Sequence, residues 1–304
     1  MKKLLFFAAI VIVGAVLFAK KPEIKTKIPL IETNDKKQDK TTVASIERKS
    51  IFIPEWTIGE ERISDNGYDR WIYFGADENR PDNISWTTYK INSVEELNKL
   101  TLQDITVEGI VLDLEISGLA TKNLINEISA GVERIYNQAK EQNLKLSLAL
   151  YGDLFYRQRP YDLKTLNQFS DEIMVMAYDF SKSYGEPGAN FPNLEFKIMI
   201  DNYLEFIPPE KLTIIFGMYG YDWTLKDGKP LKPAGALTLN QIKTKFSERI
   251  MTDSESKEKK ISYKGSDGYD HVVFFEDEES AEVKINYLKE KGIGSIAFWA
   301  LGYF

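Results

Sequence analysis

The sequence contains no cysteine, and its 304 residues include a single histidine, His271. Without cysteine the chain can have no disulfide framework, thiolate metal site or cysteine nucleophile. One histidine disfavours a multi-histidine metal site and a histidine-based catalytic triad. The chain also lacks an excess of positive charge, because 46 Asp and Glu outnumber 39 Lys and Arg; the formal net charge is −7 and the isoelectric point is about 5.1. Phosphate binding needs a basic field, so we expect no nucleic-acid partner, and we expect neither a metal nor a cofactor.

The N-terminal apolar stretch is shorter than an ordinary membrane span. Residues 4–19 are uncharged and follow two lysines, whereas a transmembrane helix needs about 20 apolar residues. Residues 1–19 are therefore predicted to be a signal peptide, with a possible cleavage site near Val13-Gly14-Ala15, or an uncleaved membrane anchor. Residues 20–50 are rich in Lys, Thr, Asp and Glu and are predicted to be a polar linker. We expect an extracytoplasmic protein, either secreted or tethered to the membrane by residues 4–19.

From residue 51 to residue 304, short apolar segments alternate with segments of helical spacing. The candidate strands are 51–56, 70–76, 84–91, 108–115, 144–152, 172–179, 211–220 and 294–302. Helical spacing occurs in 119–142, 162–170, 194–206 and 277–291. Strands that alternate with helices predict an α/β fold with a parallel sheet, and eight such strands predict a (β/α)8 TIM barrel.

Two parts of the chain depart from an even barrel pattern. Residues 51–107 hold three candidate strands with too little chain between them for full helices, so we expect an abbreviated N-terminal third. A small α+β insertion, about 221–276, separates the last two strands. It is predicted to contain a helix near 238–250 and a hairpin over 260–275.

The candidate strand EGIVLDLEIS, residues 108–117, carries two carboxylates where a core strand should have none. Side chains alternate across a strand, so Asp113 and Glu115 share the face of Val111, opposite the face of Ile110 and Leu112. In a barrel, that face lines the interior and its last residues reach the C-terminal mouth, where catalytic groups lie. Two neighbouring carboxyls cannot both ionise cheaply, so one should keep a proton near neutral pH. The alternative is a strand end whose acids simply face solvent.

These residues resemble glycoside hydrolase family 18, the chitinase-like hydrolases. The family pattern D-G-x-D-x-D-x-E is matched by Glu108-Gly109-Ile110-Val111-Leu112-Asp113-Leu114-Glu115, and M-x-Y-D by Met176-Ala177-Tyr178-Asp179. Trp299 matches the tryptophan of the family's last strand. The stretches YGYDW (219–223) and HVVFFEDEESA (271–281) resemble the spore-cortex-lytic, peptidoglycan-directed branch.

The resemblance implies substrate-assisted hydrolysis, in which the acetamido oxygen of an N-acetyl sugar attacks its own anomeric carbon. Glu115 would protonate the leaving oxygen and then activate water. Asp113 would hold the acetamido N–H, and Tyr178 would donate to the acetamido oxygen. Asp179 would help to frame the same pocket, and Trp299 would form a flat apolar floor under the sugar.

One departure from the family pattern bears on the chemistry. Val111 stands where many relatives have an aspartate that pairs with the residue matched by Asp113. An apolar neighbour increases desolvation, which favours a protonated Asp113 or a proton shared with Glu115. We expect an altered acidic limb of the pH–rate profile, which Val111→Asp should move.

Four further residues are candidates for substrate binding: Met176, Tyr219, Trp223 and Tyr151. For Trp223, stacking on sugar rings and packing within a loop are both open, and Tyr151 could equally fill the barrel. Other residues have structural interpretations. His271 is expected at the rim, Trp56 and Trp71 in the core, and the acidic run 276–279 at a helix N-terminus.

The sequence thus predicts a glycosidase that hydrolyses β-linked glycans containing N-acetylglucosamine, with peptidoglycan favoured over chitin. The alternative is a non-catalytic, lectin-like member of the same fold that only binds such glycans. Because inactive relatives usually lose the acid matched by Glu115, its presence favours the enzyme. The oligomeric state stays open.

Overall fold

The computed structural model describes residues 44–59, 67–103, 105–246 and 249–304. The apolar run 4–19 and almost all of the predicted linker lie outside these residues. Within them, no helix is both long enough and apolar enough to cross a membrane.

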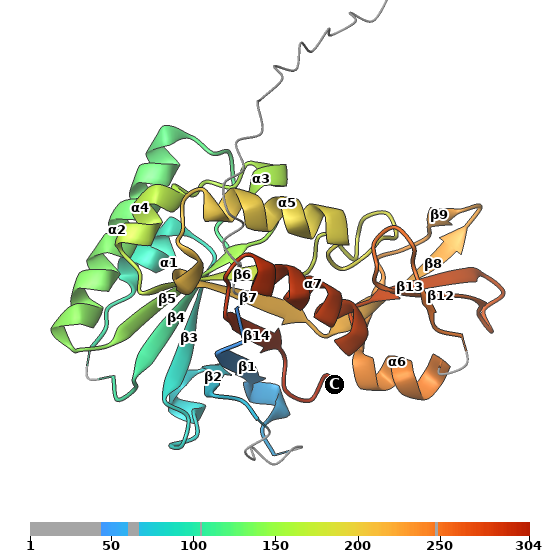
Figure 1. Cartoon of the computed structure of the whole chain (residues 1–304), viewed down its shortest axis with the longest axis horizontal. Helices are drawn as coiled ribbons and strands as arrows, with labels where there is room; N and C mark the ends of the chain where they lie inside the picture. The colour runs from blue at the N-terminus through green and yellow to red at the C-terminus, as the bar shows by residue number, and fades with distance from the viewer. Residues whose placement is uncertain (1–43, 60–66, 104, 247–248) are drawn as a thin grey trace, which may run out of the picture. The chain divides into compact units, whose positions relative to one another are not determined.

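Eight parallel strands close into a barrel, which confirms the predicted (β/α)8 fold (Figure 1). Around the barrel the strands follow the order β1, β14, β7, β6, β5, β4, β3, β2. Their bounds are β1 Arg48–Pro54, β2 Arg70–Phe74, β3 Trp86–Ile91, β4 Gly109–Leu114, β5 Lys145–Tyr151, β6 Glu172–Ala177, β7 Leu212–Gly217 and β14 Ser295–Trp299. The first strand begins three residues before the expected start of the domain.

Helices cover the outside of the barrel unevenly. They are α1 Val94–Lys99, α2 Lys122–Glu141, α3 Leu154–Arg157, α4 Leu163–Gln168, α5 Asn193–Leu204 and α7 Glu278–Glu290, with a short 3-10 turn η3 at Pro209–Lys211. The described residues between the first three strands form only the 3-10 turns η1 Glu55–Thr57 and η2 Asp77–Asn79. The N-terminal third is therefore abbreviated, as the spacing of the first strands predicts.

The longest helix, α2, shows why these segments fold as they do. Its first turn is capped by Thr121, whose hydroxyl accepts a hydrogen bond from the Leu124 N–H (3.2 Å). Ile128, Val132 and Ile135 recur at three- and four-residue steps and are fully buried. Burying each such side chain contributes about 1.5–3 kcal/mol, so this one face fixes the helix against the strands.

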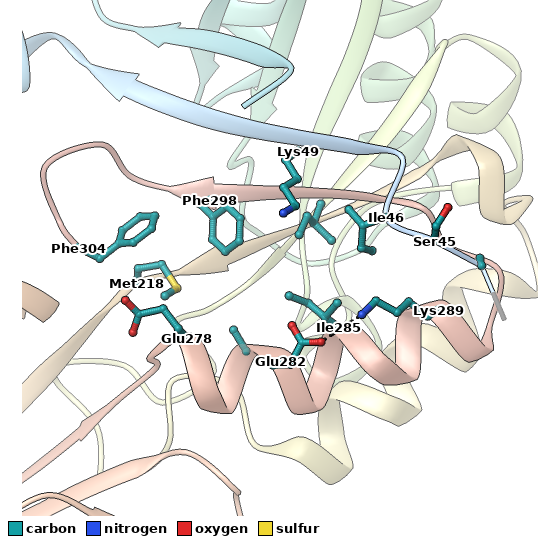
Figure 2. Close-up of a pocket in the computed structure, with 13 residues that line it drawn as sticks. Ser45, Ile46, Lys49, Met218, Glu278, Glu282, Ile285, Lys289, Phe298 and Phe304 are labelled. Atoms are coloured by element: carbon teal, nitrogen blue, oxygen red, sulfur yellow. Dashed lines mark hydrogen bonds and ion pairs between the residues drawn. The ribbon is translucent and has the colours of Figure 1, made fainter. Parts of the chain in front are cut away.

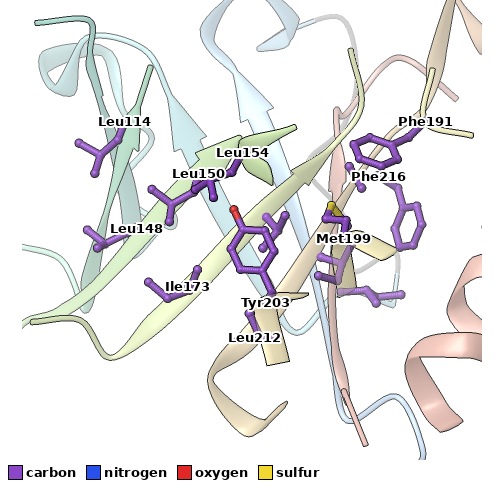
Figure 3. Close-up of a cluster of buried hydrophobic side chains, with 14 of the residues drawn as sticks. Leu114, Leu148, Leu150, Leu154, Ile173, Phe191, Met199, Tyr203, Leu212 and Phe216 are labelled. Atoms are coloured by element: carbon purple, nitrogen blue, oxygen red, sulfur yellow. The ribbon is translucent and has the colours of Figure 1, made fainter. Parts of the chain in front are cut away.

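The two faces of β4 have the contents that alternation predicts. Ile110, Leu112 and Leu114 lie in the layer between strands and helices, part of which Figure 3 shows. Val111 belongs instead to the cluster that fills the barrel interior. Gly109 lies on the same face as Val111. The position requires glycine, because a Cβ at residue 109 would lie 2.5 Å from the Trp86 ring.

A charged network closes the N-terminal end of the barrel. Glu172 at the start of β6 accepts two hydrogen bonds from Arg70 (2.8 and 3.0 Å) and one from Arg48 (2.6 Å). Ser147 and Thr213 also donate to it. Burial alone would raise the pKa of Glu172, but these partners, led by the Arg70 guanidinium, lower it to about 2. This carboxylate is a structural anion.

The predicted insertion forms a second, antiparallel sheet beside the barrel. Its elements are β8 Tyr219–Lys226, β9 Lys229–Pro230, β10 Gly235–Thr238, α6 Leu239–Phe246, β11 Met251–Thr252, β12 Lys259–Lys264 and β13 Asp270–Phe275. The expected hairpin is β12 and β13, paired from Lys259↔Phe275 to Lys264↔Asp270. The expected strand 211–220 is two strands, because the chain leaves the barrel after Gly217 and enters the insertion sheet at Tyr219.

A cavity of about 600 Å³ lies outside the barrel, between β1, β14 and α7 (Figure 2). Ile46, Ile285 and Phe298 supply part of its apolar wall, and Glu278 and Lys289 part of its polar wall. Neither Asp113 nor Glu115 lines it, so this cavity is separate from the site described next.

Candidate active site

The two carboxylates of the fourth strand lie together at the C-terminal mouth of the barrel. Asp113 is placed between Lys90 of β3 and Ala149 of β5 and is only 6% exposed. Glu115 follows the strand, and its side chain is 29% exposed. The Lys90 Nζ lies 2.9 Å from Glu115 Oε1. One carboxyl is therefore buried, and its neighbour stands at the solvent boundary with a cation beside it.

The surroundings of Asp113 favour its protonated form. Burial is the largest cause and the charge of Glu115 the next; together they raise the pKa of Asp113 to about 8, although Lys90 opposes them. A protonated Asp113 can also donate a hydrogen bond to Glu115. At neutral pH the two carboxyl groups thus hold one proton between them. One of their oxygens, Asp113 Oδ1, is buried and has no hydrogen-bond partner among the described residues.

Tyr151, at the end of β5, lies beside Glu115 and also packs against the cluster inside the barrel. Its hydroxyl lies 3.4 Å from Glu115 Oε2 and 3.3 Å from the Glu115 carbonyl oxygen. The Arg159 guanidinium lies 3.8 Å from the centre of the Tyr151 ring and is itself held by Asp153. Burial, followed by the charge of Glu115, raises the pKa of Tyr151 far above its ordinary value. The tyrosine is therefore a neutral group that lines the site.

Met176 and Tyr178 come from β6 and the residues just after it. Met176 is buried inside the barrel, and the partly buried Tyr178 packs against the same interior cluster. The pKa of Tyr178 is raised well above its usual value, first by burial and then by the charges of Asp113, Asp179 and Glu115. Its hydroxyl thus remains a donor beside the carboxylates.

Trp299 ends the last barrel strand and packs within an aromatic group at the mouth. Its ring centre lies 4.8 Å from that of Phe74, 5.7 Å from that of Phe52 and 6.4 Å from that of Trp56. The expectation that Trp56 is a core residue is wrong, because it is 56% exposed at the end of β1. Trp56 therefore extends the aromatic surface of Trp299 outward.

Two of the predicted binding residues do not face the mouth. Trp223 is fully buried, and its Nε1 donates to the Gly185 carbonyl (3.1 Å), so of the two interpretations left open it is packing, not stacking on substrate, that the structure shows. Its ring packs against the rings of Tyr221 and Phe274, contacts that a single sequence does not reveal. Tyr219 is only 8% exposed and donates its hydroxyl to Asp179. It supports the site from behind.

Asp179 stands in an unusual backbone conformation. Its φ of 56° lies in the left-handed region, which aspartate tolerates better than most residues. Its N–H donates to the Asn190 Oδ1 (2.7 Å), and its carboxylate accepts from Tyr219 and from Tyr221 (2.8 Å). This carboxylate is thus held in one orientation by two tyrosine hydroxyls.

The remaining predicted features have structural roles. His271 bonds to Asp222 (2.9 Å) and Asp267 (3.1 Å) in the insertion. Asp277 caps α7 in a reciprocal pair with Ser280, as expected for the acidic run. Among the residues that the structure describes, no three acids or histidines gather as a metal site.

Three residues near the site were not predicted. Lys90 and Arg159 touch Glu115 and Tyr151, and Asn190 holds Asp179. Lys90 could have been predicted, since it lies near the end of a candidate strand on the face that leads to the mouth. Asn190 lies in a loop, where no periodicity indicates which way a side chain points.

The fold and the site together define an α/β-barrel protein with paired acids at the carboxyl ends of its strands, the arrangement of a barrel hydrolase. The chain belongs to glycosyl hydrolases family 18, whose family model matches residues 82–303.

Among curated proteins, the chain is similar to cortical fragment-lytic enzymes. That of Bacillus subtilis (strain 168) is 26% identical over 231 residues, which cover 68% of this chain and 53% of the relative. That of Bacillus anthracis is 31% identical over 145 residues, which cover 47% of this chain and 34% of the relative. The chain thus spans from about a third to about half of these relatives' length.

Solved structures of the same fold include the Bacillus cereus spore cortex-lytic enzyme SleL. Its TM-score is 0.67 at 20% identity, over 86% of this chain and 72% of that chain. A chitinase from Cycas revoluta in complex with (GlcNAc)3 has a TM-score of 0.65 at 20% identity, over 83% of this chain and 94% of that chain. At such identities these likenesses establish the fold alone.

Proposed function

We propose that this chain hydrolyses β-linked glycans that contain N-acetylglucosamine, with Glu115 as the acid and base. The observation that carries the proposal is the pair of Asp113 and Glu115, which holds one proton close to Tyr178. Tyr178 and Trp299 pack against the same cluster inside the barrel. A structural anion such as Glu172 is surrounded by cations, whereas Asp113 faces another acid. That arrangement supplies a mobile proton at the mouth of the barrel.

The chemistry follows from where that proton can go. In the free protein it rests on Asp113 and is shared with Glu115. An acetamido N–H that donates to the unpartnered Oδ1 stabilises the ionised form of Asp113, so binding favours transfer of the proton to Glu115. Glu115 then protonates the leaving oxygen while the acetamido oxygen, held by Tyr178, attacks the anomeric carbon. Water activated by the Glu115 carboxylate opens the resulting oxazolinium ion.

Peptidoglycan is the favoured substrate class. The curated relatives include cortical fragment-lytic enzymes. In addition, the Lys182 Nζ lies 5.7 Å from the centre of the Tyr151 ring, which places a cation beside the cleft. Peptidoglycan carries carboxylates on its peptides, whereas chitin carries none. A cation at this position therefore favours the anionic glycan.

We also place the protein outside the cytoplasm, where its proposed substrate lies. The support is the apolar run 4–19 after two lysines, which suits export or a membrane tether. Fractionation of cells that express the full chain tests this, and recovery in the cytosol alone would reject it.

The central experiment compares the purified chain with its Glu115→Gln variant on peptidoglycan fragments and on N-acetylglucosamine oligomers, with products weighed by mass spectrometry. We expect cleavage by the wild type and a loss of at least about 100-fold in the variant, because proton transfer contributes factors of that size. Equal product from both proteins would reject the role of Glu115. Binding by both without product would favour the lectin-like alternative.

A further inference from the structure

The loop between β6 and α5, residues 178–192, carries Asp179 and is hydrogen-bonded to residues of the insertion. The Trp223 Nε1 donates to the Gly185 carbonyl (3.1 Å), and the Ala234 N–H donates to the Ser183 carbonyl (2.7 Å). Both donors belong to the insertion, and Trp223 follows Gly185 by 38 residues in the sequence. The insertion is therefore bonded directly to the segment that enters the candidate active site.

Asn190 forms the innermost link of this contact. It is 2% exposed, and its Oδ1 accepts the Asp179 N–H (2.7 Å). Its Nδ2 donates to the carbonyl oxygens of Gly217 (3.0 Å) and Tyr219 (3.3 Å), at the point where β7 gives way to β8. The Asn190 side-chain amide thus connects residue 179, which has a left-handed backbone, to the junction of β7 and β8. Its oxygen accepts one hydrogen bond and its nitrogen donates two.

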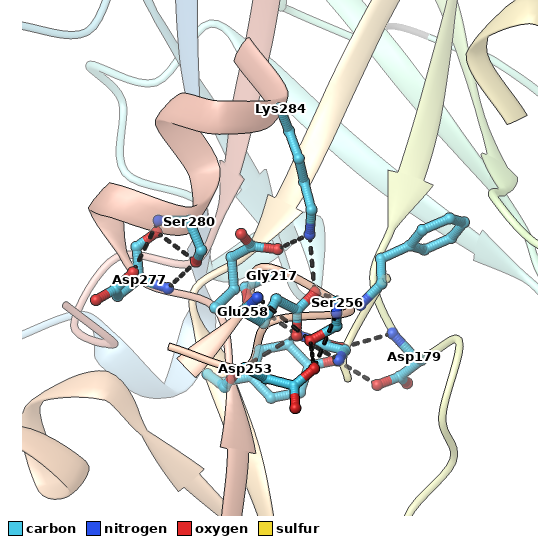
Figure 4. Close-up of polar contacts among 12 residues, drawn as sticks. Asp179, Gly217, Asp253, Ser256, Glu258, Asp277, Ser280 and Lys284 are labelled. Atoms are coloured by element: carbon cyan, nitrogen blue, oxygen red, sulfur yellow. Dashed lines mark hydrogen bonds and ion pairs between the residues drawn. The ribbon is translucent and has the colours of Figure 1, made fainter. Parts of the chain in front are cut away.

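Glu258 of the insertion accepts the backbone N–H of Asn190, and Figure 4 shows Glu258 beside Lys284. Its carboxylate is fully buried and accepts the N–H groups of Asn190 (2.6 Å) and Phe191 (2.7 Å). The Lys284 Nζ of α7 lies 2.8 Å from the same carboxylate. Burying such a pair costs several kcal/mol in lost hydration unless its bonds are complete. Here the cost is offset by bonds that fix the end of the loop.

We propose that Asn190 and Glu258 are positioning residues that hold Asp179, and through it Tyr219 and Tyr221, at the acetamido pocket. The inference rests on the proposed function for its catalytic consequence. Both residues are buried, Asn190 within the loop and Glu258 in the insertion, so each would act through its contacts and not on the substrate. The insertion is accordingly part of the catalytic apparatus, because a shift in it moves Asp179.

The first test is the variant Asn190→Leu, which is close in size and removes all three side-chain hydrogen bonds. We expect kcat/KM on the glycan to fall 10- to 100-fold, because displacements of about 1 Å cost factors of that order. Asn167→Leu is the matched control. It loses one hydrogen bond to the Phe206 carbonyl (3.1 Å), away from this loop, and should leave kcat/KM within about twofold of the wild type.

A double-mutant cycle separates positioning from general stability. Asp179→Gly removes the carboxylate without backbone strain, because glycine accepts a positive φ. If Asn190 acts through Asp179, adding Asn190→Leu to Asp179→Gly should change kcat/KM by less than about threefold. Effects that multiply in full would show that Asn190 acts elsewhere, and the inference would fall.

A third measurement needs no substrate, so it judges the inference even if the chain cleaves nothing. The Asp179 amide proton should exchange with solvent at least about 10-fold faster in Asn190→Leu than in the wild type, measured by NMR. Glu258→Gln should show a smaller increase. Unchanged exchange in Asn190→Leu would overturn the proposal, whereas absent hydrolysis by the wild type would count only against the proposed function.

Discussion

The proton on Asp113 can be tested through protein stability, independently of any substrate. Asp113→Asn keeps the shape of the protonated carboxyl and its ability to donate to Glu115, but it cannot titrate. In the wild type the folded pKa of Asp113 is about 8, which exceeds the ordinary aspartate value of 3.8. Between these values the folded state holds one more proton than the unfolded state. This contribution to stability is complete below pH 3.8 and is lost as the pH rises through 8.

The size of the effect follows from that one proton. One bound proton changes the free energy of unfolding by about 1.4 kcal/mol per pH unit. From pH 5 to pH 7, the wild type should therefore lose about 3 kcal/mol relative to Asp113→Asn. The slope in this window does not depend on the exact pKa, provided that the folded value lies above 7.

Urea unfolding at pH 5, 6 and 7 and at constant ionic strength measures this difference directly. Glu276→Gln provides a positive control, because burial raises the pKa of Glu276 to about 8 as well, outside the barrel. Each variant should flatten the pH dependence by a similar amount. Parallel curves for the wild type and Asp113→Asn would show that Asp113 is ionised, and the shared-proton argument would fail.

Three other outcomes follow from the same structure. Val111→Asp places a carboxyl on the inward face beside Asp113, and it should move the acidic limb of kcat/KM against pH; an unchanged limb would contradict this. Arg70→Leu leaves Glu172 buried without its main partner, and it should cost about 3–5 kcal/mol in urea unfolding; a loss below 1 kcal/mol would count against it. Lys182→Gln should raise KM several-fold for peptidoglycan fragments but not for neutral oligomers; equal effects on both would reject carboxylate recognition.

The barrel could be predicted because its physical causes are local. Alternation along 108–115 placed Asp113 inward and Leu112 outward, and helical spacing located α2 to within three residues at its start. The aromatic residues were harder. Trp56 and Trp223 have similar flanking sequences of mixed polarity, yet one is 56% exposed and the other is fully buried. The insertion sheet decides this difference, and a single sequence does not say what a sheet covers.

The positioning contacts could not have been predicted, because they join distant parts of the chain. Asn190 meets Glu258 across 68 residues, and Lys284 meets Glu258 across 26. Taken alone, each of these residues is of a polar type that is common on protein surfaces. Only the folded chain places them together behind Asp179, where none of them touches solvent freely.

Three buried carboxyls show that burial alone does not assign a role. Glu172 is paired with guanidinium groups and has its pKa lowered to about 2, so it stays charged as a structural anion. Glu276 and Asp113 both have pKa values raised to about 8, with burial as the largest cause. Yet Glu276 is enclosed with Lys284, whereas Asp113 stands next to Glu115, whose side chain is 29% exposed. The acid that can exchange its proton with a group at the solvent boundary is the one suited to catalysis.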